Sequence, residues 1–393
     1  MQSRRSFLAI PLAFATDWPQ WRGPNRDGSI PAEPSKAWPE RLKSVWSVTV
    51  GEGHASPVVV GNRVFQFARQ GEQETILGLE LETGKQLWKQ SYNAPYEMNS
   101  AATGHGKGPK ATPAVSDNRL YTSGINGMLS CWDVNSGKKL WDYNAQGSPE
   151  FGQSSSPVVD RGLLIASVGP QRGGALTGFD ASTGKVRWQW KEDGPAYASP
   201  VITEIGGIRQ AITNSQNNLV SVSVADGKSQ WKLPLSTPYD QNAVTPIVVG
   251  DLVIYSGLSN PVTAIHPGPK PSKAWENKEV GMYMNSPVLA SGVLWGLSHR
   301  NKGQYFGLDP KTGKTVWTSQ GRQTENAALI ARGENVFSLT TDSELILFKA
   351  TPKSLETVRK YTVANSPTWA HPVVLGNRIL VKDKTTLALW SAE

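Results

Sequence analysis

The decapeptide FDASTGKVRW at residues 179–188 decides the fold, because close copies of it recur along the chain. Each copy ends in a tryptophan and holds a glycine four residues earlier. The others are LELETGKQLW at 79–88, WDVNSGKKLW at 132–141, VSVADGKSQW at 222–231 and LDPKTGKTVW at 308–317. A period of about 40 to 50 residues is typical of β-propellers and related repeat architectures.

A second marker runs in phase with the first. A serine or threonine followed by proline opens an apolar stretch at Ser56-Pro57, Thr112-Pro113, Ser156-Pro157, Ser199-Pro200, Thr245-Pro246 and Ser286-Pro287. Weaker copies place Ala328 and Pro372 at the proline position, and Trp275 and Tyr361 at the aromatic position. The two markers together predict eight repeats.

The last repeat lacks its aromatic segment, since no TGKxxW sequence follows Pro372. Residues 43–50, KSVWSVTV, carry the missing strand pattern and an aromatic residue. We therefore expect an all-β fold, an eight-bladed β-propeller of four-stranded antiparallel blades whose ring is closed by the N-terminal strand. Closure of this kind leaves no exposed sheet edge. The residues expected to dock each blade are Trp46, Trp88, Trp141, Trp188, Trp231, Trp275, Trp317 and Tyr361.

One repeat shows the four strands of a blade. In the second repeat they are expected at 111–116, 119–124, 128–134 and 138–144, with polar turns between them. In the hairpin of the third repeat, Asp180 can cap local amides and Gly184 can take a positive φ. Because stacked repeats share one core, residues 43–393 are expected to form a single domain.

The N-terminus has the pattern of a targeting signal. A basic segment at 1–5, an apolar run at 7–14 and the small-x-small sequence Ala13-Phe14-Ala15 predict a signal peptide at 1–15. The sequence SRRSFL at 3–8 resembles a twin-arginine signal, so the protein is expected to be periplasmic or secreted. The alternative is a disordered leader with chance arginines. Residues 16–42 are expected to wrap the outside of the propeller.

Composition disfavours several classes of function. The net charge of +8 falls to +6 without Arg4 and Arg5, and no basic stripe with interleaved aromatics is present, so nucleic acid is not an expected partner. No run after the signal approaches the roughly 20 apolar residues of a membrane span. The five histidines lack metal-ligand spacing, and lone Cys131 is expected to be a small buried residue. We expect a monomer.

The (L/F)D-x-x-T-G-K-x-x-W segments resemble the tryptophan-docking repeats of pyrroloquinoline-quinone (PQQ)-type eight-bladed propellers, across residues 43–393. The opening DWPQWRGPN at 17–25 also resembles the N-terminal segment of many exported propellers of this type. Such repeats occur in quinoprotein alcohol and sugar dehydrogenases. They occur equally in non-enzymatic scaffolds, among them the propeller lipoprotein of the outer-membrane β-barrel assembly machinery.

The resemblance leaves two functions open. A quinoprotein dehydrogenase of this family implies PQQ, a disulfide between adjacent cysteines, a calcium ion and a catalytic aspartate. The single cysteine forbids that disulfide, and no cluster of acidic and amide residues matches the calcium site. We therefore expect an exported, non-enzymatic scaffold that binds a protein or an extended ligand and needs no cofactor. The alternative is a PQQ-dependent oxidoreductase, with calcium, acting on an alcohol or sugar.

Any ligand site is expected at one mouth of the central channel, where the resemblance places the start of each innermost strand. Residues just ahead of each Ser/Thr-Pro pair vary while the pair is constant, and nearby turns add basic residues. The candidate ligand-binding residues are His54, Lys110, Ser154, Tyr197, Asn242, Glu325, Trp369, Arg172 and Arg300. A basic mouth suits a carboxylate, a phosphate or an acidic peptide. The alternative is that these are solvated loop residues. The glycine-rich loop 104–108 is expected to form a lip over this mouth, and no catalytic or metal-binding residue is assigned.

Overall fold

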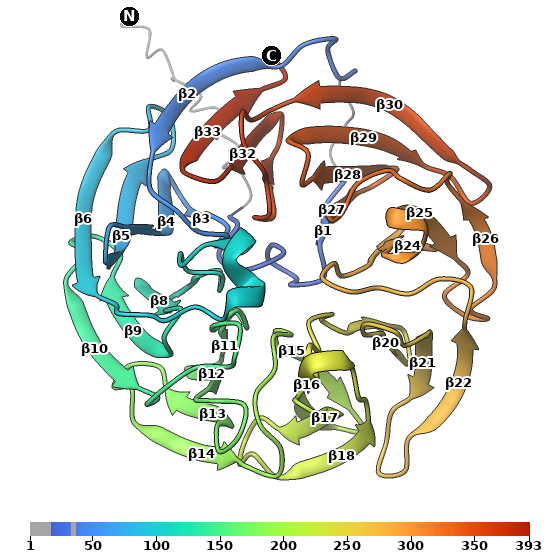
Figure 1. The fold of residues 1–393 in the computed structure, drawn as a ribbon, viewed down its shortest axis with the longest axis horizontal. Helices are drawn as coiled ribbons and strands as arrows, with labels where there is room; N and C mark the ends of the chain where they lie inside the picture. The colour runs from blue at the N-terminus through green and yellow to red at the C-terminus, as the bar shows by residue number, and fades with distance from the viewer. Residues whose placement is uncertain (1–16, 33–36) are drawn as a thin grey trace, which may run out of the picture.

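Eight four-stranded antiparallel blades are arranged in a ring in the computed structural model, which describes residues 17–32 and 37–393 (Figure 1). We call the space on the axis of this ring the channel. The predicted propeller is confirmed. The predicted signal peptide lies outside the described residues. Within the described ranges, no helix has the length and hydrophobicity needed to cross a membrane.

The blades follow one another along the chain. Blade 1 holds β3 (Val58–Val60), β4 (Arg63–Gln70), β5 (Gln73–Glu80) and β6 (Gln86–Asn93). Blade 2 holds β7 (Ala114–Ser116), β8 (Arg119–Ser123), β9 (Met128–Asp133) and β10 (Lys139–Asn144). Blade 3 holds β11 (Val158–Asp160), β12 (Leu163–Val168), β13 (Ala175–Asp180) and β14 (Val186–Trp190). Blade 4 holds β15 (Val201–Ile205), β16 (Ile208–Asn214), β17 (Asn218–Ser223) and β18 (Ser229–Pro234).

The second half repeats this order. Blade 5 holds β19 (Ile247–Val249), β20 (Leu252–Tyr255), β21 (Val262–His266) and β22 (Ser272–Asn277). Blade 6 holds β23 (Val288–Ala290), β24 (Val293–Ser298), β25 (Gln304–Leu308) and β26 (Thr315–Thr318). Blade 7 holds β27 (Ala327–Arg332), β28 (Asn335–Thr340), β29 (Glu344–Ala350) and β30 (Leu355–Thr362). Blade 8 holds β31 (Val373–Leu375), β32 (Arg378–Lys382), β33 (Thr386–Ser391) and β2 (Lys43–Thr49). In the part of the chain that the structure describes, three short 3-10 helices lie in loops: η1 (Ser100–His105), η2 (Pro238–Asp240) and η3 (Arg300–Lys302).

Blade 8 closes the ring as predicted. Strand β2 pairs antiparallel with β33, and Trp46 lies opposite Leu389. The outer strand of this blade therefore comes from the N-terminal part of the chain and its three inner strands from the C-terminal part. Side chains from blades 1, 7 and 8 share one apolar cluster around this closure.

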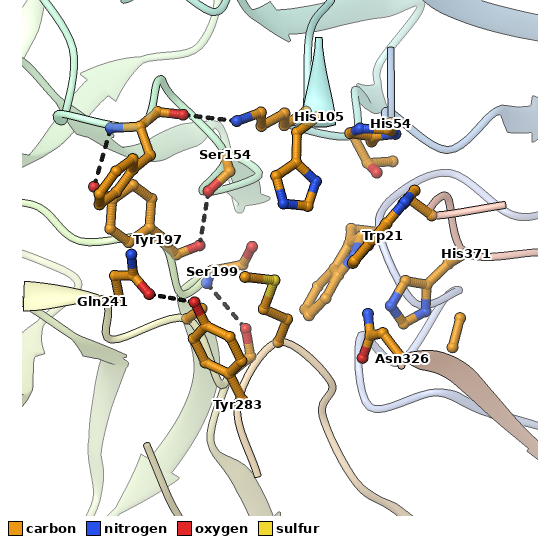
Figure 2. A pocket seen from close by; sticks show the side chains of 18 of the residues that line it. Trp21, His54, His105, Ser154, Tyr197, Ser199, Gln241, Tyr283, Asn326 and His371 are labelled. Carbon is orange, nitrogen blue, oxygen red and sulfur yellow. Dashed lines mark hydrogen bonds between the residues drawn. The ribbon is translucent and has the colours of Figure 1, made fainter. Parts of the chain in front are cut away.

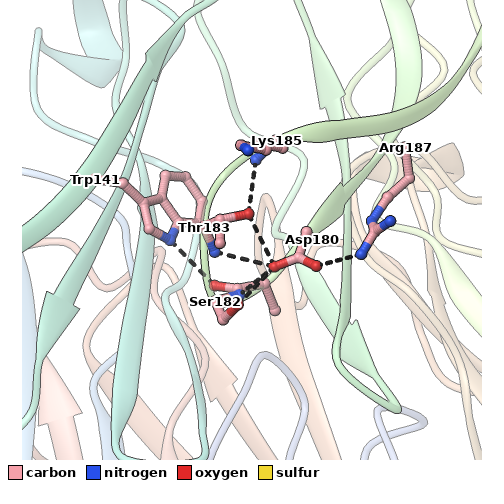
Figure 3. Close-up of polar contacts among 7 residues, drawn as sticks. Trp141, Asp180, Ser182, Thr183, Lys185 and Arg187 are labelled. Atoms are coloured by element: carbon pink, nitrogen blue, oxygen red, sulfur yellow. Dashed lines mark hydrogen bonds and ion pairs between the residues drawn. The ribbon is translucent and has the colours of Figure 1, made fainter.

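The aromatic residues of the outer strands dock each blade on the next. The indole N–H groups of Trp46, Trp88, Trp141, Trp188 and Trp275 donate to the carbonyls of Leu81, Val134, Ala181, Val224 and Pro310, at 2.9–3.1 Å. Each acceptor lies in the hairpin before the outer strand of the following blade. Asp180 shapes one such hairpin by accepting hydrogen bonds from the backbone N–H groups of Ser182 and Thr183 (Figure 3). The hairpin glycine lies against the indole ring of the docking tryptophan, since a Cβ on Gly184 would stand 2.6 Å from Trp141.

Two docking tryptophans have no such hydrogen bond. The buried indole nitrogens of Trp231 and Trp317 have no hydrogen-bond partner among the described residues. The blades that follow them turn through residues 266–272 and 350–355, which lack the Thr-Gly-Lys segment. Tyr361 faces the ring closure, where no hairpin exists, and its hydroxyl donates to the carbonyl of Pro39 at 2.6 Å. The repeated hairpin thus supplies the acceptor for the tryptophan of the preceding blade.

A chain of hydrogen bonds runs around the inner wall of the channel and explains the Ser/Thr-Pro marker. Each hydroxyl accepts the backbone N–H of the equivalent residue in the preceding blade, at 2.8–3.1 Å. The bonds join His371 to Ser56, Ser56 to Thr112, Thr112 to Ser156, Ser156 to Ser199, Ser199 to Thr245 and Thr245 to Ser286. Blade 7 has Ala327 and Ala328 at this place, so the chain of hydroxyls ends at blade 6.

The N-terminal extension corrects one expectation, because its first part lies inside the ring and does not wrap the outside. Trp18 is buried and bridges to Val59 of blade 1, and β1 (Ser29–Ile30) pairs in parallel with β27 of blade 7. Only the later part runs over the surface, where Trp38 packs on Phe337 with ring centroids 5.1 Å apart. The innermost strands are sheet edges with unpaired backbone groups facing the channel, and this segment supplies partners for them.

Two arginines anchor the segment in the channel. Arg26 donates to the carbonyls of Pro157 and Pro200 at 3.0 and 2.6 Å, and also to Ser156. Arg22 donates to Pro287 on the far side of the ring. Both have a left-handed backbone, with φ of 61° and 60° for Arg22 and Arg26, a conformation that persists only where its surroundings hold it. The extension therefore ties blades 3, 4 and 6 together from within.

Candidate functional site

A cavity of about 280 Å³ opens at the mouth of the channel where the loops between blades gather. We call it the cup. Figure 2 shows its side chains converging from many blades. Its lining residues are Trp21, His54, Ser56, Ala101, Ala102, His105, Lys110, Thr112, Phe151, Ser154, Tyr197, Ser199, Gln241, Ala243, Thr245, Tyr283, Met284, Asn326, Ala327, Ala328, Trp369 and His371.

Five of the candidate residues from the sequence meet in the cup, namely His54, Lys110, Ser154, Tyr197 and Trp369. All five precede the proline position by three residues, at the end of a loop that enters an innermost strand. The repeat gives each blade the same loop-to-strand entry, so one position per blade reaches a common space.

The other four candidates lie outside the cup. Asn242 is buried and donates to the carbonyls of Ser215, Gln216 and Leu235, so it fixes loops while its neighbour Ala243 lines the cavity. Glu325 and Arg172 are exposed on loops. Arg300 donates to the carbonyl of Lys278. Asn242 and Arg300 therefore hydrogen-bond to loop carbonyls, whereas Glu325 and Arg172 face solvent.

Several lining residues have no counterpart in the sequence-based candidates. Trp21 comes from the N-terminal segment, which belongs to no repeat and so has no phase from which to place it. His371 stands ahead of Pro372, where six other repeats have serine or threonine. This departure from the pattern could have marked His371 as a candidate. His105 ends η1, at the start of the glycine-rich loop expected to form a lip, and this helix does lie at the mouth.

Aromatic and imidazole rings form one wall of the cup. The ring of Trp369 lies 4.7 Å from His105 and 5.9 Å from His54 between centroids. Trp21 meets His371 edge-on at 5.3 Å. The ring nitrogens His54 Nε2 and His371 Nδ1 are enclosed and have no hydrogen-bond partner within residues 17–32 and 37–393. Unpartnered buried polar atoms of this kind are uncommon in folded proteins.

Burial keeps these imidazoles neutral. Desolvation, with the nearby charges of His105, Lys110 and Lys382, lowers the pKa of His54 to about 3. Desolvation and Arg22 lower the pKa of His371 to about 3. Each ring therefore presents a neutral nitrogen at physiological pH, able to donate or accept a hydrogen bond according to its tautomer.

The floor and wall carry positive charge. Lys110 Nζ donates to the carbonyl of Phe151 at 2.7 Å, and burial lowers the pKa of this amine to about 8. Below the cup, the guanidinium carbons of Arg22 and Arg26 lie 5.4 and 5.9 Å from the centroid of the Trp21 ring. Desolvation lowers the pKa of Arg22 and Arg26 to about 10 and 9, so both stay charged at neutral pH.

The donor set of the cup does not fit a calcium-bound quinone. Calcium requires several carboxylate and carbonyl oxygens, and none of the described residues that line the cavity is Asp or Glu. In the part of the chain that the structure describes, no group of His, Cys, Asp and Glu has the geometry of a metal site. Cys131 is buried within blade 2 and does not reach the cavity.

Comparison with known proteins shows what the chain is similar to. A family model described as outer membrane protein assembly factor BamB matches residues 72–319. The outer membrane protein assembly factor BamB of Yersinia pestis is 21% identical over 361 residues, covering 87% of this chain and 86% of that protein. The crystal structure of BamB from Moraxella catarrhalis has a TM-score of 0.66 at 14% identity, over 89% and 97% of the two chains. A europium-containing methanol dehydrogenase has a TM-score of 0.71 at 12% identity, over 96% and 98%. At these identities the two structures share the fold.

Proposed function

This chain belongs to the outer membrane protein assembly factor BamB family, and on that premise we propose that it is an exported, non-enzymatic scaffold that binds a protein or an extended ligand in the cell envelope. The proposal includes residues 1–15 as the signal that directs export, by the twin-arginine route, to the periplasm. The observation that carries it is a complete eight-bladed ring whose channel mouth has no carboxylate among its described lining residues.

The mouth of the channel is the surface that we assign to the partner. Tyr239, in the loop between blades 4 and 5, is 77% exposed and has a φ of 59°. Met284, in the loop between blades 5 and 6, is 38% exposed at the edge of the cup. Exposed tyrosine and methionine are the residue types enriched in protein interfaces. A left-handed tyrosine costs about 1–3 kcal/mol, which favours a role for the exposed ring over chance.

Affinity capture from envelope extracts, followed by identification of the bound proteins, tests the scaffold. We expect the chain to retain an outer-membrane or periplasmic partner, and Tyr239→Ala to lose it. Ile208→Ala is the matched control, because Ile208 is 43% exposed but follows the turn between β15 and β16, at the opposite end of the blade. Capture that is equal for all three proteins would contradict the assignment of the mouth, and no specific capture by the wild type would contradict the scaffold.

The alternative function, a PQQ oxidoreductase acting on an alcohol or sugar, is disfavoured by the donor set of the cup. Calorimetric titration with PQQ, with and without calcium, tests this directly. We expect no saturable heat in either condition. Stoichiometric, calcium-dependent binding would revive the oxidoreductase and would call for dye-reduction assays on alcohols and sugars.

A further inference from the structure

The cup combines features that the scaffold function does not require. One of its lining residues, Trp21, belongs to the N-terminal segment that lies in the channel. Its lining includes aromatic and imidazole rings, among them Trp369, His54 and His371. A mostly apolar cavity with a few converging polar groups is the usual form of a small-molecule site, and about 280 Å³ suits a compact ligand.

The charges around the cup favour an anion. The ammonium group of Lys110 has three N–H donors, and the structure shows one acceptor for them, the carbonyl of Phe151. Arg22 and Arg26 beneath Trp21 donate only to neutral oxygens in the hydrogen bonds described, those of Gln20, Asp27, Ser156, Pro157, Pro200 and Pro287. The Asp27 carboxylate attracts Arg22, but it accepts hydrogen bonds from Ser29. None of the described lining residues is Asp or Glu, so Lys110 has no carboxylate partner in the cavity; Glu150, Asp240 and Glu325 act on the lining residues Tyr197 and Tyr283 from outside it.

The geometry points to a binding site in the cup for a compact, hydroxylated organic anion, such as a sugar carrying one carboxylate or phosphate, held without a metal ion. The acidic group pairs with Lys110 in the field of the two arginines. Ligand hydroxyls hydrogen-bond polar side chains that line the cavity, such as Ser154, Gln241 and Asn326. The apolar face of the ligand ring packs on Trp369 or Trp21. The cup shares Met284 with the partner surface, whereas Tyr239 does not line it.

Calorimetric titration in buffer with EDTA, using glucuronate, glucose 6-phosphate and neutral glucose, tests the site. We expect one of the two anions to bind at least about tenfold more tightly than glucose, a difference that reports the charge. Preference for glucuronate or for glucose 6-phosphate identifies the acidic group. The proposal is overturned if neither anion binds at millimolar concentration, if glucose binds equally well, or if binding requires added calcium.

Matched variants locate the binding. Lys110→Gln is expected to weaken the anion at least about tenfold, while Lys302→Gln, an exposed lysine of η3 at the same mouth that does not line the cup, changes it less than about twofold. If Lys110→Gln melts abnormally, Ala243→Trp serves instead, because it fills the cavity without removing a charge and is expected to abolish binding. Unchanged binding in a folded Lys110→Gln or Ala243→Trp protein would place the ligand elsewhere and overturn the proposal. Partner capture with the same variants is a separate readout, so failure of this site and failure of the scaffold are distinguishable.

Discussion

The indole N–H of Trp188 donates a 2.9 Å hydrogen bond to the carbonyl of Val224, which joins blade 3 to blade 4. The same contact recurs at Trp46, Trp88, Trp141 and Trp275, and is absent at Trp231 and Trp317. The docking contact thus has two components, the burial of a large ring and a hydrogen bond, and the chain contains blades with and without the second.

Trp188→Phe is expected to lower the free energy of unfolding by about 1–3 kcal/mol beyond the effect of Trp231→Phe. The first substitution leaves a buried carbonyl without its donor, whereas the second removes an N–H that had no acceptor. Urea denaturation followed by circular dichroism measures both. Equal losses would mean that ring packing alone holds the blades.

Gly184→Ala is expected to destabilise the protein more than Gly162→Ala. Both glycines have a positive φ, 71° and 80°, so both substitutions carry the same backbone strain. Only at Gly184 would the new Cβ meet a ring, 2.6 Å from Trp141, while nothing lies within 4 Å of the Cβ position at Gly162. The difference in melting temperature between the two variants reports the contact between the blades. Gly184→Val should disrupt the packing of this hairpin on Trp141. A Gly184→Ala protein no less stable than Gly162→Ala would refute this explanation.

Arg26→Met is expected to cost about 3 kcal/mol or more, since it leaves the carbonyls of Ser156, Pro157 and Pro200 in the channel without a donor. Arg161→Met, at an exposed turn that also has a positive φ, is the control and should change stability by less than about 0.5 kcal/mol. Thermal melting measures both. Deletion of residues 1–50 should be more damaging still, because it also removes β2. A truncated chain that melts unchanged would show that neither the strand nor the arginines hold the ring.

Acid is expected to destabilise the protein through His54 and His371. Both have a pKa of about 3 in the folded protein and an ordinary value of 6.5 when unfolded. Between these two pH values the unfolded chain binds more protons than the folded protein does. The free energy of unfolding therefore falls as the pH is lowered from about 6.5 to about 3, and these two groups cause no further loss below pH 3. His371→Gln should flatten the dependence of the urea midpoint on pH over this window. A His371→Gln protein with the wild-type slope would contradict this explanation.

The sequence predicts the ring because the features that build it are local and repeated. Trp188 and Gly184 lie four residues apart, and this spacing recurs in each hairpin that contacts the docking tryptophan of the preceding blade. The closing strand could be located because Trp46 has the pattern that the last repeat lacks. The same phase identifies His54, Lys110 and Tyr197 as residues of a shared mouth, because each precedes an innermost strand by the same distance.

The remainder of the cup depends on contacts that have no period. Trp21 and Arg26 belong to a segment outside the repeats, and Arg26 meets partners more than a hundred residues away in sequence. Asn242 and Ala243 are adjacent, yet one side chain binds loop carbonyls and the other faces the cavity, a difference set by backbone direction within an irregular loop. Such details arise from tertiary packing and cannot be derived from spacing.

The ring is fastened at two radii and in two neighbouring blades. The outer fastening is β2 on blade 8, and the inner one is β1 on blade 7, where the hydroxyl chain is interrupted. A short N-terminal segment thus pairs both with the innermost strand of blade 7 and with the outer side of blade 8. The number of blades is therefore restrained at two places. A ring with one repeat more or fewer would have to keep both strand pairings with the same short segment.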